Sequence, residues 1–158
     1  MSKYETPAYE IKLKEGDFEL RTYKDFYIVE YENASDPDLN YGFGTLFRYI
    51  SKSIDRNEKI SMTIPVIKEV TERGLKMAFV VPQSHWNNIP HPIDEKLKIG
   101  KFDEGTFATL TYSGSSTAHK EQRQIELLET WIAGKNLTVR SNFMVAIYNG
   151  PYILPMFP

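Results

Sequence analysis

The stretch from Leu39 to Pro65 constrains the fold more than any other part of the chain, because a helix pattern there leads directly into a strand pattern. Apolar residues recur at spacings of three and four, which places them on one face of a helix. A strand signal then opens on Met62-Thr63-Ile64-Pro65. We therefore predict a helix that packs one face on a sheet; its apolar stripe is Leu39, Phe43, Leu46, Ile50 and Ile54.

Phe47 lies beside this stripe, roughly 60° from its centre in a helix that turns about 100° per residue. Its neighbours on that flank are small or polar: Asn40, Gly44 and Ser51. A glycine in a helix interior costs about 1 kcal/mol relative to alanine, and close approach of a ligand or a strand would offset that cost. An aromatic side chain beside small residues leaves room for a flat ligand, so we predict a binding surface on this flank.

Composition and charge limit the class of protein. The 158 residues suit one domain, and the net charge of −2, with acids and bases interspersed, argues against a nucleic-acid binder. The absence of cysteine excludes disulfides and thiol catalysis. No apolar run approaches the roughly 20 residues of a membrane span, and the first residues lack a signal-peptide pattern. We expect a cytoplasmic monomer.

Alternation of apolar and polar residues predicts strands before and after the helix. A first hairpin and a third strand are expected at Tyr9–Leu13, Phe18–Thr22 and Phe26–Tyr31. Later strands are expected at Ile60–Val70 and Leu75–Val81, a second hairpin at Glu95–Phe102 and Thr106–Tyr112, and a last strand at Phe143–Tyr148. A second helix is expected to begin after a cap at Ser116 or Thr117 and to end at Gly134.

The order of strands, helix and strands occurs twice, at about residues 8–81 and 95–158. A shift of 79 positions lays the apolar residues Phe18, Leu20 and Tyr23 on Leu97, Ile99 and Phe102. This is a weak internal repeat, carried by element order more than by identity. Two such units would pair edge to edge into one curved sheet or barrel with both helices outside, which makes an α+β fold.

The sequence contains no assembled catalytic or metal-binding motif. Its histidines are His85, His91 and His119, and none has a partner at metal-ligand spacing. His119 is interpreted as a surface residue of the second helix, whereas His85 and His91 share a proline-rich loop and stay weak candidates for ligating a metal or haem. A nucleophile elbow and a phosphate-binding loop are also missing, so we expect a protein that is not an enzyme.

Six short segments, spread in order along nearly the whole chain, resemble the motifs of one family. They are Glu19-Leu20-Arg21-Thr22-Tyr23, FGTLFRYI (43–50), ISMTIPV (60–66), FVVP (79–82), Pro90-His91-Pro92, and Tyr148-Asn149-Gly150-Pro151 with Pro155. This series is similar to that of the SOUL/haem-binding proteins. The ISMTIPV strand is the most specific of the six segments. The others support the resemblance mainly because they occur together and in order.

The resemblance implies a single SOUL-like domain over residues 1–158, a distorted β-barrel of two β-α-β-β repeats with two helices packed outside. It also implies that haem or another tetrapyrrole binds non-covalently in a shallow apolar groove between the first helix and the C-terminal tail. Arg48 would pair with a propionate, because guanidinium and carboxylate form a strong pair. The remaining residues implied at the site are Asn40, Phe43, Gly44, Leu46, Phe47, Ile153, Leu154 and Met156.

Two departures from the family pattern bear on haem ligation. Thr22 stands where some members carry a histidine that has been considered a haem ligand. The chain also stops at Pro158, before the Asn-Glu-hydrophobic strand with which the family tends to end. We therefore expect haem to bind without a strong axial ligand.

Two other classes of binding protein remain open. Effector-binding domains of transcription regulators share the two-repeat plan and hold cationic drugs through a buried acid. The strand Phe143–Tyr148 carries no acid, but Glu30 and Glu69 could substitute. In the third class, a protein-interaction module, the groove and the apolar tail would take a peptide.

Overall fold

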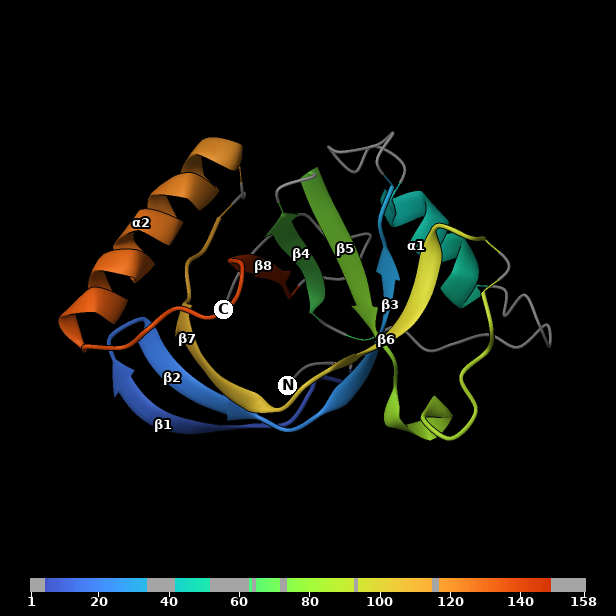
Figure 1. Ribbon diagram of the computed structural model, residues 1–158, viewed down its shortest axis with the longest axis horizontal. Helices are drawn as coiled ribbons and strands as arrows, with labels where there is room; N and C mark the ends of the chain where they lie inside the picture. The colour runs from blue at the N-terminus through green and yellow to red at the C-terminus, as the bar shows by residue number, and fades with distance from the viewer. Residues whose placement is uncertain are drawn as a thin grey trace.

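The computed structural model describes residues 5–33, 42–51, 63, 65–71, 74–92, 94–114 and 117–148. This part of the chain is an α+β fold with two sheets and two helices (Figure 1). The strands are β1 (Tyr9–Glu15), β2 (Phe18–Tyr23), β3 (Phe26–Tyr31), β4 (Val66–Thr71), β5 (Gly74–Val80), β6 (Leu97–Phe102), β7 (Gly105–Leu110) and β8 (Met144–Ile147). The helices are α1 (Gly42–Ser51), α2 (Ala118–Gly134) and the short 3-10 turn η1 (Gln83–His85).

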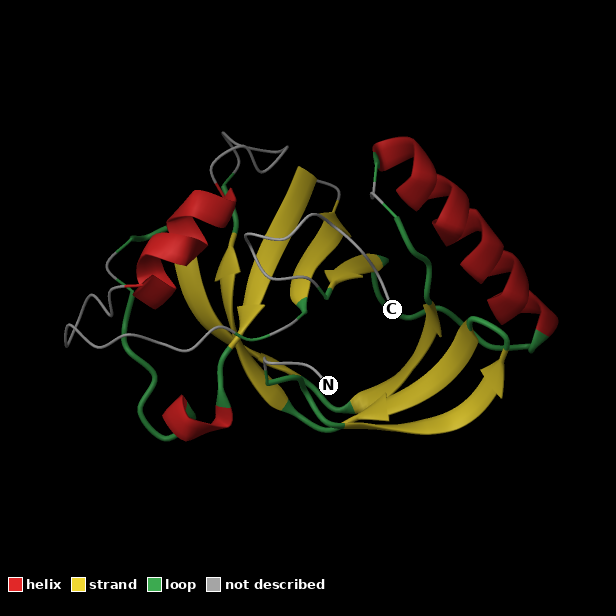
Figure 2. Ribbon diagram, turned by 180° about the vertical axis from the view of Figure 1, so that it is seen from behind, coloured by secondary structure: helices red, strands yellow, loops and turns green. Residues whose placement is uncertain are grey.

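The described strands form two antiparallel sheets, with the orders β1-β2-β7 and β6-β3-β5-β4-β8. Within the described ranges these sheets do not close into a barrel. Figure 2 shows the two sheets diverging from the region where they meet, with α1 and α2 at opposite ends of the molecule.

Where the two sheets meet, the segments 18–31 and 97–110 pair with each other in a single register that continues from one sheet into the other. Residues 18–23 pair with 105–110 in the smaller sheet, and residues 26–31 pair with 97–102 in the larger one. The register does not shift between Tyr23↔Gly105 and Phe26↔Phe102. The Asp25 carboxylate accepts a hydrogen bond from the Glu104 amide at 2.6 Å across the interruption. The strand pairs β2–β7 and β3–β6 are therefore two halves of one bent, two-stranded ribbon that joins the two sheets.

The predicted second hairpin is wrong. The segments Glu95–Phe102 and Thr106–Tyr112 were expected to pair with each other, but β6 pairs with β3 and β7 pairs with β2. Alternation identifies a strand, but it does not identify a partner 66 to 92 positions away. Asp103-Glu104-Gly105 also has the composition of a turn. The chain continues along the ribbon at that point instead of reversing.

Most of the other predicted elements are confirmed. The β1–β2 hairpin and the strands β3, β5 and β8 all occur as expected, and β4 pairs antiparallel with β5. Thr117 caps α2 by accepting a hydrogen bond from the Lys120 amide at 3.1 Å. The predicted cap of the first helix at Asp36, its stripe residues Leu39 and Ile54, and the strand residues 60–62 lie outside the described residues.

α1 packs on one face of the larger sheet and forms the main core with it. Leu46 and Tyr49 are 4% and 0% exposed and pack with Val29, Tyr31 and Phe79 from β3 and β5. The Tyr49 hydroxyl also donates to the Pro90 carbonyl oxygen, which fixes the loop after β5 to the helix. The opposite face of this sheet carries a second apolar cluster, Phe26, Ile28, Ile67, Ala78 and Val80.

α2 attaches to the smaller sheet through Trp131, through an ion pair of Lys135 with Glu15, and through the buried side chain of Ile132. The Trp131 ring stacks on Phe18 with centroids 5.2 Å apart, and its indole N–H donates to the Glu15 carboxylate at 3.0 Å. Ile132 is buried, whereas Leu127 stays 47% exposed. No helix in the described part of the chain is long and apolar enough to span a membrane.

We expect Leu46→Ala to lower the free energy of unfolding by about 3 kcal/mol, because it removes buried methyl groups and leaves a cavity under α1. Leu127→Ala is the matched control on an exposed helix position and should change that free energy by less than about 0.5 kcal/mol. Urea denaturation followed by circular dichroism measures both. Equal losses in the two variants would contradict the assignment of Leu46 to the core.

Candidate ligand-binding site

The exposed surface of α1 brings together two of the predicted site residues. Gly44 and Arg48 are both exposed, one helical turn apart. A Cβ atom added at Gly44 would lie 3.9 Å from Arg48 Nη1, so the guanidinium lies over the glycine. Arg48 Nη2 also donates to the Thr45 hydroxyl at 3.5 Å. This arrangement presents a cation beside a patch of bare helix backbone, where a flat anionic ligand could approach.

The other predicted site residues are not gathered there by the described structure. Leu46 points into the core and presents 4% of its surface to solvent. Asn40, Ile153, Leu154 and Met156 lie outside the described residues, as do the side chains of Phe43 and Phe47. The structure therefore shows Gly44 and Arg48 on the exposed surface of α1, and the binding site as a whole stays a prediction.

The two candidate histidines lie on the loop between β5 and β6. His85 ends the turn η1 and is half-buried, whereas His91 is exposed between the buried Pro90 and Pro92. Among the described residues, no three His, Asp or Glu side chains are grouped so that they could hold a metal ion. Metal ligation by either histidine stays a weak prediction.

A cavity of about 1070 Å³ lies between the two sheets, beside α2 and not beside α1. Ligand pockets usually have volumes of about 300–1,000 Å³, so this cavity is slightly larger than a usual one. Apolar side chains from β2, β7, α2 and β8 line it, among them Leu20, Phe107, Leu128 and Met144. Sequence reasoning missed this cavity, because β2 lies more than 80 positions before β7, α2 and β8, the other segments that form its walls.

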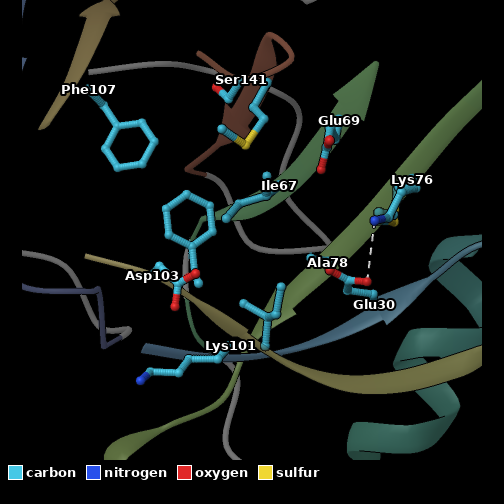
Figure 3. A pocket seen from close by; sticks show the side chains of 13 residues that line it. Glu30, Ile67, Glu69, Lys76, Ala78, Lys101, Asp103, Phe107 and Ser141 are labelled. Atoms are coloured by element: carbon cyan, nitrogen blue, oxygen red, sulfur yellow. Dashed lines mark ion pairs between the residues drawn. The ribbon is translucent and has the colours of Figure 1, made fainter. Parts of the chain in front are cut away.

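A smaller cavity of about 290 Å³ adjoins it and shares Ile67, Phe102, Phe107 and Met144 with it. It lies over the face of the larger sheet opposite α1, with Ile67 and Ala78 on its floor (Figure 3).

The two acids considered as substitutes for a drug-binding carboxylate, Glu30 and Glu69, both line the smaller cavity. Lys76 Nζ pairs with Glu30 at 3.4 Å, drawn as the dashed line in Figure 3. Glu69 accepts from the neutral side-chain amide of Asn142 at 2.9 Å. Glu69 thus accepts a hydrogen bond from a neutral amide, with Lys76 as its direct cross-strand partner, whereas Glu30 forms the ion pair with Lys76.

Arg21 links the N-terminal and C-terminal motifs. Glu19, Arg21 and Tyr23 alternate along β2, which puts their side chains on one face of the sheet. Arg21 Nε donates to the Glu19 carboxylate at 2.7 Å, and Nη1 donates to the hydroxyls of Tyr23 at 3.1 Å and Tyr148 at 3.5 Å. The motif at Glu19–Tyr23 therefore holds the end of β8 across 127 positions of sequence.

The protonation states in this cluster follow from burial and hydrogen bonding. Burial would raise the pKa of Glu19, but hydrogen bonds from Arg21 and Lys14 outweigh it and hold that pKa below its ordinary value of 4.5. Burial is also the main cause that raises the pKa of Tyr148. At neutral pH the cluster therefore contains a carboxylate, a guanidinium and a protonated phenol.

Other motif residues make similar contacts between distant segments. Thr63, from the ISMTIPV segment, is fully buried and donates to the Val80 carbonyl oxygen of the FVVP segment at 2.5 Å. Tyr49, from FGTLFRYI, donates to Pro90 of the Pro-His-Pro segment. Sequence reasoning missed these structural roles, although alternation along residues 19–23 was a usable signal.

The described chain is thus an α+β protein with two adjoining cavities and an exposed arginine on its first helix. The family profile described as "SOUL heme-binding protein" matches residues 4–157. The chain therefore belongs to the SOUL heme-binding protein family, as its motif series predicted. A search of curated proteins finds no match to the chain.

We expect Glu19→Gln to lower the free energy of unfolding by about 3 kcal/mol at neutral pH, because Arg21 would lose its counter-ion in a buried setting. A carboxylate with a lowered pKa stabilises the fold above its unfolded pKa, and that contribution is lost as the pH falls through the folded value. The difference between wild type and Glu19→Gln should therefore shrink below about pH 4.5. Urea unfolding at neutral pH and at a pH below about 4.5 measures this difference in the free energy of unfolding.

Glu10→Gln is the matched control on the neighbouring strand. Glu10 forms an exposed ion pair with Lys12 at 3.4 Å, and such pairs contribute less than about 1 kcal/mol. Its effect should be small at either pH. A Glu19→Gln effect that is equally small would contradict the role given to the Arg21 cluster.

Proposed function

We propose that this protein binds haem or a related tetrapyrrole non-covalently at the exposed surface of α1, as a carrier, buffer or sensor without catalytic activity. Family membership over residues 4–157 supports the ligand class. The observation that carries the location is the Arg48 guanidinium lying over Gly44 on the exposed side of α1. An arginine can pair with a propionate through two parallel hydrogen bonds, and the missing side chain at Gly44 lets the guanidinium lie close to the helix.

In this proposal the apolar walls come from Phe43 and Phe47 of α1 and from Ile153, Leu154 and Met156 of the tail, with Asn40 at the edge. Leu46 supports the site from the core. The iron receives no strong axial ligand from the protein. The protein acts in the cytoplasm as a monomer, without nucleic acid.

The proposal also includes the finer architecture. One domain of two β-α-β-β repeats, at about residues 8–81 and 95–158, forms a distorted barrel. The unbroken register of the bent ribbon supports it, because that ribbon already joins the two sheets on one side.

A haemin titration followed by absorbance tests the ligand and the site together. We expect the Soret band to shift and saturate at micromolar protein, and Arg48→Glu to weaken binding about tenfold or more, because a charge-assisted pair becomes a repulsive one. Arg123→Glu makes the same change at an exposed position of α2 and should leave the affinity unchanged.

Two results would contradict the tetrapyrrole proposal. An unshifted Soret band would reject the ligand, and equal affinities of wild type and Arg48→Glu would reject the site. His91→Ala separates the two locations, because loss of the response in that variant alone would move binding to the loop.

A second candidate function is binding of a small cationic molecule in the cavity that Glu30 and Glu69 line. Glu69 favours it, because its carboxylate is met by the neutral Asn142 amide and can accept a cation. The apolar floor of Ile67 and Ala78 would suit an aromatic body.

Fluorescence anisotropy of the cationic dye rhodamine 6G tests this second candidate. Saturable binding that Glu69→Gln weakens about tenfold would support it, since a charged hydrogen-bond partner is lost. Glu126→Gln, on the exposed face of α2, is the control and should not change the anisotropy curve. Curves that are the same for Glu69→Gln and wild type would reject the cavity as a cation site.

A further inference from the structure

The large cavity between the sheets has a polar end that the tetrapyrrole proposal does not use. Tyr23 and Tyr148 both line this cavity, and Arg21 donates to both of their hydroxyl oxygens. The side chain of Arg21 is 12% exposed. A buried cation therefore stands directly behind two hydroxyl groups at the cavity wall.

Arg21 is the cation that contacts these hydroxyls, and its own counter-ion, Glu19, is shared with Lys14. Glu19 accepts from Arg21 at 2.7 Å and from Lys14 at 3.0 Å, so one carboxylate faces two cations. A phenol oxygen that accepts a hydrogen bond from a cation becomes a better donor through its own proton. Burial, together with the neighbouring Tyr23 hydroxyl to which Tyr148 is hydrogen-bonded, raises the pKa of Tyr148. The two phenols share one hydrogen bond, so the pair retains one proton that it can donate to a carboxylate oxygen.

The rest of the cavity suits an apolar body. Leu20, Phe107, Leu128, Ile132 and Met144 line it, and its volume is about 1070 Å³. The charged side chains that also line it, Asp103, Glu104 and Arg140, are exposed, where water and salt screen them. The cavity thus combines one buried positive end with a long apolar wall.

We propose that this cavity binds a long-chain carboxylate, with its carboxylate on the hydroxyls of Tyr23 and Tyr148 and its chain along β7 and α2. The site is separate from the surface of α1, and the proposal does not depend on tetrapyrrole binding. The ligand class follows from complementarity, because a single carboxylate matches the positive end and an alkyl chain matches the apolar wall.

Fluorescence titration with cis-parinaric acid, a fluorescent polyunsaturated fatty acid, tests the proposal. We expect saturable binding, and about tenfold weaker binding of its methyl ester, which lacks the negative charge. Tyr148→Phe should weaken binding of the acid about fivefold or more. Tyr27→Phe is the matched control, because its ring packs on Trp86 and the residue does not line the cavity.

Ala146→Phe tests the location, because Ala146 lines the cavity on the same strand face as Met144 and should block it when enlarged. Ala133→Phe adds the same ring at an exposed position of α2 and should bind as wild type does. Thermal unfolding of both variants shows that they fold. Equal binding of the acid and its ester would overturn the proposal, as would wild-type affinity in a folded Ala146→Phe protein.

Haemin affinity in the Ala146→Phe variant separates the two proposals. The α1 site predicts that this affinity stays unchanged while binding of cis-parinaric acid is lost. The carboxylate proposal for this cavity would be overturned if the Ala146→Phe protein lost haemin binding but still bound cis-parinaric acid as wild type does.

Discussion

The fold depends on the strand pair that runs without a register shift through both sheets. Residues 18–31 and 97–110 are paired along their length except at Lys24-Asp25 and Asp103-Glu104, where the ribbon bends. The Asp25 carboxylate crosses this bend to the Glu104 amide and to Lys101. α1 packs on the larger sheet and α2 on the smaller one (Figure 1). The bend therefore sets the space between the two sheets, which is where the cavities lie.

Motif residues mainly join segments that are distant in sequence. Arg21 holds Tyr148, Thr63 holds Val80, and Tyr49 holds the Pro90 carbonyl. Each contact satisfies a polar group that would otherwise cost free energy when buried. Many motif residues of this family therefore have a structural role in this chain, because they connect the sheets, the first helix and the loop after β5. The proposed tetrapyrrole site at Gly44 and Arg48 includes none of these contacts, whereas Tyr148 lines the cavity between the sheets.

Local patterns in the sequence predicted the elements well and their pairing only in part. Helical spacing separated the buried Leu46 from the exposed Gly44 and Arg48, and the cap at Thr117 followed from its residue type. The partners of β6 and β7 could not be predicted, because pairing across the chain leaves no local signal. The large cavity stayed hidden for the same reason, since Leu20 and Met144 meet only in the folded protein.

The most direct test of the central claim is a map of tetrapyrrole contacts on the whole protein. Two-dimensional amide NMR during titration with gallium protoporphyrin IX, a diamagnetic substitute for haem, would provide it. Binding at α1 predicts that the amides of Gly44 and Arg48 shift first and most, while those of β7 stay nearly unchanged. Shifts confined to the residues that line the cavity between the sheets, or no saturable shifts, would contradict the claim.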